Sequence, residues 1–350
     1  MSFIIGNFVC SNQSIHFSKD MHKSVIQVAK IILPLFLGGA ILYWMYRDFD
    51  FTLVKDVMLN DMNWTWMLLS FPFGVTAQLF RGLRWRQTLE PIGEHASTNT
   101  SVNAVFLSYA TSLVIPRVGE FLRCGVLKRY DNVTFSKSLG TVVTERAVDS
   151  MMVLLVTVVT LLLQLPVFHH FFATTGTRLD TFFGQFTSTG YIVTFICLIA
   201  ALLLLWWLAV ALHLGHKMHD IISDLWQGVA SLRNVENVPL YLFYTIGIWA
   251  SYFLHFYLTF YCFESTAGLG MNCALVSFVV GSIAVIVPTP NGAGPWHFSV
   301  KTMLILYGVE SNAALSFVLI VHTVQTLLVV LLGIWGWISL SLTKPVGKSQ

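Results

Sequence analysis

The sequence predicts an all-α integral membrane protein with six spanning helices and two re-entrant, broken-helix hairpins in an inverted-topology repeat. Two observations lead to this fold class. The 350-residue chain is 55% hydrophobic and only 11% charged, with a mean hydropathy of +0.71, whereas typical soluble domains carry about 25% charged residues. In addition, apolar windows recur along the chain at about the 20 residues that a helix needs to cross a bilayer.

Six apolar windows are long enough to span a membrane. In chain order they cover residues 27–46, 63–81, 138–165, 190–214, 239–262 and 312–341. Two shorter apolar segments, 103–115 and 274–287, each run into residues rich in proline and glycine. Proline removes a backbone donor and glycine frees the backbone, so both helices should be interrupted. The expected helix breaks are at Pro116, Gly119, Pro288, Pro290, Gly292 and Gly294.

The orientation of these windows follows from where lysine and arginine lie, because both concentrate in cytoplasmic loops. Basic residues flank the windows on one side, whereas three connecting segments are poor in them: 47–62, 166–189 and 263–273. This pattern puts both termini in the cytoplasm. This assignment of sides is self-consistent only if segment 103–130 enters the membrane from the cytoplasm and returns to the cytoplasm. Segment 274–309 must likewise enter from outside and return to the outside.

The two halves therefore have the same order of elements in opposite orientations. The predicted organisation is a polar N-terminal segment (1–26, with Met21 as a candidate translation start), one transmembrane domain (27–341, with halves 27–165 and 190–341) and a cytoplasmic tail (342–350). Transporters with inverted repeats place the substrate path where two broken elements meet near the midplane. Irregular helices in a membrane enzyme or scaffold remain an alternative with the same hydropathy.

Charged residues gather around the first expected break and in the third window: Arg117, Glu120, Arg123, Glu145, Arg146 and Asp149. Glu145 and Asp149 are four residues apart and share a helix face, and Arg146 is three residues from Asp149. Charges inside a membrane are costly and mark a functional site by default. Two interpretations stay open, a salt-bridge cluster that pins the hairpin and, as we favour, arginines that bind a phosphate.

The candidate headgroup-binding residues are Arg117, Glu120, Arg123, Arg146, Asn291 and His297, with Glu145 and Asp149 as a supporting charge network. The second break is nearly uncharged, and its His297 is either a headgroup contact or a satisfied core residue. His255 and His322 lie within expected spans, where they either pack in the core or face the same cavity. Segment 81–86 is most simply a cytoplasmic anchor.

Other classes of function find little support in the sequence. The net charge of +3 comes with no dense basic patch, which argues against nucleic acid. No phosphate-binding loop, zinc-protease or α/β-hydrolase motif occurs, and we expect neither a metal nor a cofactor. One enzymatic alternative is a glycosyltransferase that uses Asp48 and Asp50 to hold a metal beside a polyprenyl phosphate. We favour a transporter over an enzyme.

Three motifs resemble, in their order, those of the lysylphosphatidylglycerol synthase transmembrane family of flippase-like proteins: Pro116-Arg-Val-Gly-Glu120 with Arg123, Glu145-Arg146 with Asp149, and Pro288-Thr-Pro-Asn-Gly-Ala-Gly294. The resemblance extends from about residue 25 to residue 341. It implies a domain of the bacterial cytoplasmic membrane that translocates or scrambles a lipid, in some members a modified phosphatidylglycerol or a polyprenyl-linked glycan. Trp296 and His297 stand where the family often has an acidic residue, so the headgroup of its best-known members is not carried over.

These observations together predict a lipid flippase or scramblase with a polar groove between the two hairpins. Its expected partners are membrane lipids. The 350 residues do not include the soluble aminoacyltransferase domain of full synthases, so we expect no synthesis of lysyl-lipid by this chain alone. A further alternative is a non-catalytic partner that presents lipid to a separately encoded lipid-modifying enzyme. The sequence indicates no oligomeric state.

Overall fold

The computed structural model describes residues 36–164 and 234–345, apart from 37, 48, 50 and 288. Within these residues every regular element is a helix, as the predicted all-α class requires. Several features of the sequence lie outside the described residues: Met21, Asp48, Asp50, Pro288 and the window 190–214.

The described helices repeat one order in the two halves of the chain. The first half contains α3 (Trp64–Leu89), α4 (Thr98–Ser112), α5 (Val118–Tyr130) and α6 (Phe135–Leu163). The second contains α11 (Val238–Tyr257), α13 (Gly270–Ala284), α14 (Pro295–Leu306) and α15 (Ser311–Leu342). Two short elements precede α3, and four connect later helices: α2 (Phe51–Asp56) and η1 (Val57–Asp61), then η2 (Glu90–Ile92), η4 (Leu258–Cys262), α12 (Glu264–Ala267) and η5 (Pro290–Gly292). Each half thus has a long helix, two short helices around a break, and another long helix.

Polar side chains fix where several of these helices begin. The Asn63 Oδ1 accepts a hydrogen bond from the backbone N–H of Thr65 at the start of α3, and the Ser97 Oγ accepts one from that of Thr100 at the start of α4. Glu310 accepts the backbone N–H groups of the first turn of α15. Such caps satisfy donors that have no partner within the helix.

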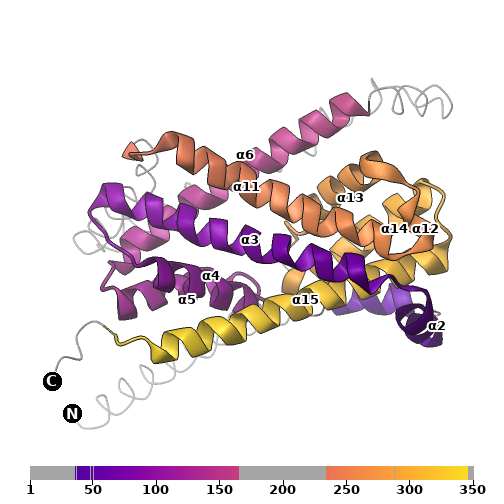
Figure 1. Ribbon diagram of the computed structural model, residues 1–350, viewed down its shortest axis with the longest axis horizontal. Coiled ribbons are helices and arrows are strands. Elements are labelled where there is room, and N and C mark those ends of the chain that lie inside the picture. The colour runs from indigo at the N-terminus through magenta and orange to yellow at the C-terminus, as the bar shows by residue number, and fades with distance from the viewer. Residues whose placement is uncertain are drawn as a thin grey trace, which may run out of the picture.

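The two interrupted segments form helical hairpins at opposite ends of the molecule. Figure 1 shows α4 and α5 near one end of the long helices α3 and α15, and α13 and α14 near the other end. We call α4, residues 113–117 and α5 the first hairpin. The second hairpin consists of α13, residues 285–294 and α14. Helix α15 packs against both hairpins, and at Gly336 an added Cβ would lie 2.9 Å from the carbonyl oxygen of Asn103 in α4.

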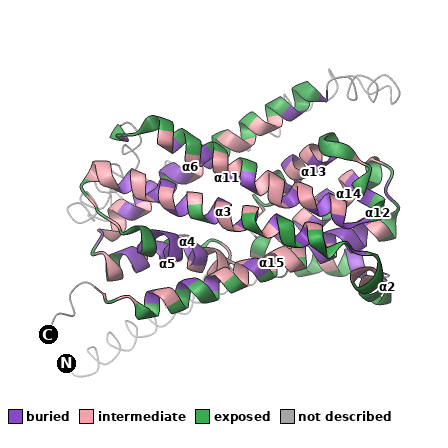
Figure 2. Ribbon diagram, in the orientation of Figure 1, coloured by how far each residue is buried: buried purple, intermediate pink, exposed green. Residues whose placement is uncertain are grey.

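Two of the described helices, α6 and α15, are long and apolar enough to cross a membrane by length and composition. Only 11% of the most apolar window of α6 is buried inside the protein, and Figure 2 shows the exposed positions along this helix. Both helices expose large apolar side chains, for example Met151, Leu154, Leu162, Leu331, Trp335 and Ile338. Exposed apolar surface of this extent indicates contact with lipid. The six-span count remains a prediction.

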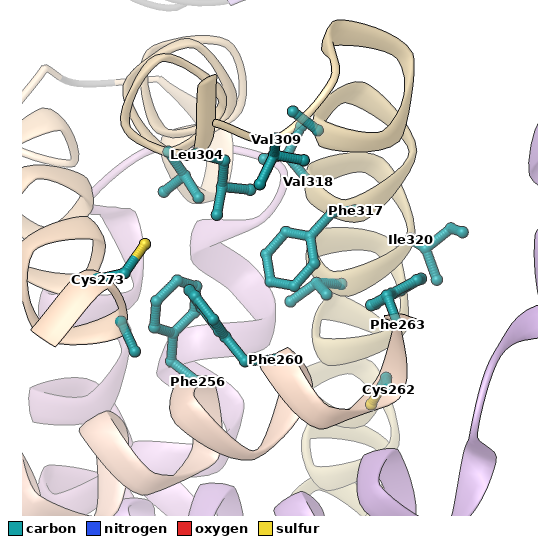
Figure 3. Packing of buried hydrophobic residues seen from close by; sticks show 14 of the residues in the cluster. Phe256, Phe260, Cys262, Phe263, Cys273, Leu304, Val309, Phe317, Val318 and Ile320 are labelled. Carbon is teal, nitrogen blue, oxygen red and sulfur yellow. The ribbon is translucent and has the colours of Figure 1, made fainter. Parts of the chain in front are cut away.

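Aromatic packing forms the core beside the second hairpin. Phe260 meets Phe256 and Phe317 edge to face, with ring centroids 5.4 Å and 5.2 Å apart. Figure 3 shows these rings packed with Cys273 and Leu304 from the two arms of the second hairpin. Such edge-to-face pairs stabilise a core beyond the area that they bury. The second hairpin is therefore held between η4 and the first half of α15.

Candidate functional site

Helix α3 directs two buried arginines at the carboxylates of α6. The Arg84 Nη2 lies 2.7 Å from Asp149 Oδ1, and the Arg81 Nη1 lies 2.6 Å from Asp149 Oδ2. Arg81 also pairs with Glu145. Arg81 and Arg84 are 2% and 0% exposed, so these ion pairs are shielded from solvent.

Two further arginines complete this group. The Arg123 Nη1 lies 2.8 Å from Glu145 Oε2, and the Arg123 guanidinium lies 4.6 Å from the ring centroid of Trp85. The Arg146 side chain is 41% exposed and places Nη2 3.0 Å from Glu145 Oε1. Its Nε lies 3.6 Å from Glu120 Oε1. We call the set of Arg81, Arg84, Arg123, Arg146, Glu120, Glu145 and Asp149 the arginine cluster.

The arginine cluster carries more positive than negative charge. Its four guanidinium groups and three carboxylates sum to +4 − 3 = +1. Within the described residues, several buried guanidinium nitrogens have no hydrogen-bond partner: the Nε of Arg81, the Nε of Arg84, and both Nε and Nη2 of Arg123. Guanidinium groups stay charged at any ordinary pH and match the geometry of a phosphate. The cluster therefore has donor capacity and net charge suited to an anion.

The expectation that segment 81–86 is a cytoplasmic anchor is wrong for Arg81 and Arg84. Helix α3 continues to Leu89, past the predicted end of the second window, and carries both arginines into the protein. Their spacing of three residues, which puts them on one helix face, was the signal that could have identified them. Arg86 fits the original interpretation better, since its side chain is 42% exposed and pairs with Glu90.

The first break covers residues 113–117 and includes Pro116. Arg117 ends the break with a left-handed backbone, φ 64°, directly before α5. Its exposed guanidinium donates from Nη2 to the Ile286 carbonyl oxygen at 3.4 Å. The two breaks, 169 residues apart in sequence, are therefore in contact.

Gly119 is not a break, in contrast to the prediction. It lies in the first turn of α5. A Cβ at this position would stand 2.6 Å from the carbonyl carbon of Ser108 and 2.6 Å from the Oγ of Ser112, both in α4. Any larger residue would therefore force the two helices of the first hairpin apart. The glycine is needed for a close approach of backbones, which the sequence alone does not distinguish from a helix break.

The second break, residues 285–294, depends on left-handed backbone geometry. Gly292 and Gly294 have φ angles of 70° and 91°, and Asn291 has 51°. Glycine adopts this region without steric cost, and asparagine tolerates it better than most residues. The Asn291 Nδ2 donates to Thr326 Oγ1 at 2.6 Å, and the His322 Nε2 lies 3.1 Å from the Asn291 carbonyl oxygen. These bonds tie the second break to α15.

A cavity of about 340 Å³ lies between the two halves of the chain. Its walls come from α3, α4, α11, α13, the second break, α14 and α15. The polar side chains that line it include Gln78, Asn291, His322, Gln325 and Thr326, and the aromatic ones include Tyr109, Trp249, Tyr252 and Trp296. Among the described residues no lysine, arginine, aspartate or glutamate lines this central cavity.

The three histidines of the second half have different positions relative to the central cavity. His255 and His322 both line it, whereas His297 does not. His297 is 3% exposed and lies behind His322, with ring centroids 4.4 Å apart. Its Nδ1 faces the backbone N–H of Gly294 at 3.4 Å. The candidate headgroup contact on this side is therefore His322, and His297 supports it from within the core.

Two tyrosines separate the central cavity from the arginine cluster. The Arg81 guanidinium lies 5.7 Å and 5.9 Å from the ring centroids of Tyr109 and Tyr252. The two hydroxyl groups are 3.3 Å apart, and the Gln78 Nε2 donates to the Tyr252 hydroxyl at 3.4 Å. The charged and uncharged parts of the site thus share one wall.

A family model described as lysylphosphatidylglycerol synthase TM region matches residues 31–333, which include both breaks, the arginine cluster and the central cavity. The chain belongs to this family. As a member of the lysylphosphatidylglycerol synthase TM region family, it is an integral membrane domain of a kind associated with lipid handling. Comparison with curated proteins and with solved structures found no match.

The described part of this family domain contains no group of three or more histidine, cysteine, aspartate or glutamate side chains that could hold a metal ion. The chemistry that it offers is ionic and hydrogen-bonding. The arginine cluster can hold an anion, while the central cavity can surround an uncharged polar group.

Proposed function

We propose that the protein is a lipid flippase or scramblase. A phospholipid or lipid-linked headgroup crosses the membrane through the central cavity while its acyl tails stay in lipid. In this proposal the chain has six spanning helices, the two hairpins are re-entrant from opposite sides, and both termini are cytoplasmic. Interrupted helices at membrane depth are tolerated where they are buried in protein or line a watery cavity, which suits the two breaks.

The observation that carries the proposal is a net positive charge next to an uncharged cavity. The arginine cluster has a surplus of one positive charge, +4 − 3, and Arg81 lies against two tyrosines that line the cavity. A lipid phosphate carries the opposite charge and accepts several hydrogen bonds from guanidinium groups. A structural salt-bridge cluster alone would need no surplus of arginine.

The exposed arginines are the ones that the phosphate meets. Arg117 has no ion pair among the described residues, and the Arg146 side chain is 41% exposed. Arg123 is 2% exposed and paired with Glu145, so it joins Arg81 and Arg84 in the supporting charge network. The carboxylates prevent the arginines from holding the phosphate so tightly that it is not released.

Transport in this proposal needs no nucleotide, since the chain has no phosphate-binding loop. Inverted-repeat transporters alternate access by moving one repeat against the other around a fixed site. The hydrogen bond from Arg117 to the Ile286 carbonyl oxygen is where one break meets the other. Loss and formation of this contact would accompany the exchange between the two orientations of the site.

The test is a translocation assay with purified protein and a fluorescent phospholipid in liposomes, without nucleotide or metal. Arg117→Ala removes an exposed guanidinium that bonds only to a carbonyl among the described residues, so it should stop lipid movement without loss of folding. Arg117→Lys retains the charge and should keep part of the rate.

The matched control is Lys128→Ala, which removes one exposed positive charge from α5, the helix that follows Arg117. It should leave the rate unchanged. Movement by Arg117→Ala at the rate of the unmodified protein would remove the phosphate role. Failure of the unmodified protein to move any phospholipid would refute transport itself.

A further inference from the structure

We infer that the central cavity binds the part of the headgroup beyond the phosphate, and that it selects an uncharged, hydroxyl-bearing group such as glycerol or a monosaccharide over an ammonium-bearing one. This inference rests on the proposed function and adds the chemical class of the substrate. It follows from the charge of the cavity walls, from polar atoms that lack a hydrogen-bond partner, and from aromatic rings that already pack against other side chains.

The walls of the central cavity offer no counter-charge to a cation. No carboxylate lines the cavity among the described residues, and the neighbouring arginine cluster carries a net +1 from +4 − 3. A cation taken from water into such a site would lose its hydration without an opposite charge to replace it, which is costly. The same walls accept a neutral polar group without this penalty.

Two polar atoms of cavity-lining residues lack a partner within the described residues: the Oε1 of Gln78 and the Nε1 of Trp249. Gln78 is only 5% exposed, so bulk solvent does not readily satisfy its acceptor. One atom needs a donor and the other an acceptor. A hydroxyl group serves both needs, whereas an ammonium group can only donate.

Three of the aromatic rings that line this cavity already face another group. A cation binds best over the face of an aromatic ring, but the Arg81 guanidinium already lies 5.7 Å and 5.9 Å from the ring centroids of Tyr109 and Tyr252. Trp296 packs against His322, with ring centroids 5.2 Å apart. These three rings therefore form a polarisable wall for a neutral ligand rather than a free cage for a cation.

The volume of the cavity fits such a group. At about 30 Å³ per water molecule, the 340 Å³ cavity has room for about ten waters. This space suffices for a glycerol or one sugar ring, and the phosphate would stay at the arginine side of the tyrosine wall. Ligand sites of this kind combine mostly apolar walls with a few well-placed polar groups.

The experiment compares three lipids with the same fluorescent acyl chain in liposomes that contain the full chain: phosphatidylglycerol, its lysine ester, and phosphatidic acid, which has no headgroup beyond the phosphate. We expect phosphatidylglycerol to move fastest and the lysine ester slowest. Gln78→Leu and Trp249→Phe should each lower the ratio of the phosphatidylglycerol rate to the phosphatidic acid rate about fivefold, as expected for one lost hydrogen bond. Trp335→Phe, at a 64% exposed position of α15, is the control and should leave the ratio unchanged.

Lipid binding to the detergent-solubilised protein, measured by native mass spectrometry with equimolar lipids, provides a readout that does not depend on transport. The inference is overturned if the lysine ester binds as well as phosphatidylglycerol, or if both cavity variants keep the preference of the unmodified protein. If lipids bind with the expected preference but none moves, the proposed function fails and the cavity assignment stands. If lipids move without any headgroup preference, the proposed function stands and the cavity assignment fails.

Discussion

Glu145→Gln should destabilise the protein strongly, because the Glu145 carboxylate is the centre of the arginine cluster. It pairs with Arg81, lies 2.8 Å from Arg123 and 3.0 Å from Arg146, and stands 3.4 Å from the Nη2 of Arg84. Glutamine has nearly the same shape but no charge. The substitution therefore changes the charge of the cluster from +4 − 3 = +1 to +4 − 2 = +2 and leaves its packing nearly unchanged.

The size of the effect follows from burial. Glu145 is 2% exposed, and the loss of one partner from a buried ion-pair network costs about 3–5 kcal/mol because the remaining charge is left uncompensated. An unfolding entropy of about 2.1 cal/mol/K per residue makes 1 kcal/mol correspond to roughly 1.5 °C in Tm for a chain of 350 residues. The Tm of Glu145→Gln, followed by tryptophan fluorescence in detergent, should therefore fall by roughly 5 °C.

Glu120→Gln is the matched control for this substitution. The Glu120 side chain is 28% exposed and pairs only with Arg146, at 3.6 Å, among the described residues, so its loss should cost less than about 1 kcal/mol. Inorganic phosphate should raise the Tm of Glu145→Gln more than that of the unmodified protein, since an anion offsets the added positive charge. Equal and small Tm shifts for both variants, with no effect of phosphate, would refute the assignment of Glu145 as the central counter-charge.

Three further predictions concern the hairpins and their connections. Gly119→Ala should lower the stability by about 1–3 kcal/mol and slow lipid movement, because its Cβ would press on the backbone of Ser108; an unchanged Tm would contradict this contact. Partial burial raises the pKa of Glu94, but hydrogen bonds from the side chain and backbone of Thr134 outweigh it and hold this pKa below the usual 4.5. The ionised Glu94 therefore stabilises the folded protein above about pH 4.5, and this stabilisation is lost as the pH falls through the lowered pKa. A Tm-against-pH profile should thus show Glu94→Gln below the unmodified protein at pH 7 and equal to it in acid. Asn291→Ala should destabilise the second break more than Asn291→Gly, because the φ of 51° is a left-handed conformation that costs alanine more than glycine; the reverse order of Tm values would rule out this backbone geometry.

Several features of this protein are determined by short stretches of sequence. Hydropathy summed over about 20 residues is enough to identify a membrane protein. The ends of α6 lie within three residues of the window 138–165, and those of α15 lie within one residue of the window 312–341. Proline and glycine act on their own backbone, so the breaks around Pro116 and Pro290 follow from local chemistry. The motifs near these breaks carry the family resemblance, which the family model over residues 31–333 confirms.

Pairing between distant side chains was decided only by the tertiary structure. Arg81 and Arg84 resemble an interfacial anchor in sequence, yet the direction in which α3 faces α6 places them 2.6 Å and 2.7 Å from Asp149. Gly119 resembles a flexible break until α4 is packed against it. A local pattern fixes which residue types a helix carries, whereas the rotation and approach of neighbouring helices fix what those residues touch. The sequence therefore determined that this membrane domain contains buried arginines and two interrupted helices, and the packing of the helices decided which arginines form the cluster and which side chains face the cavity.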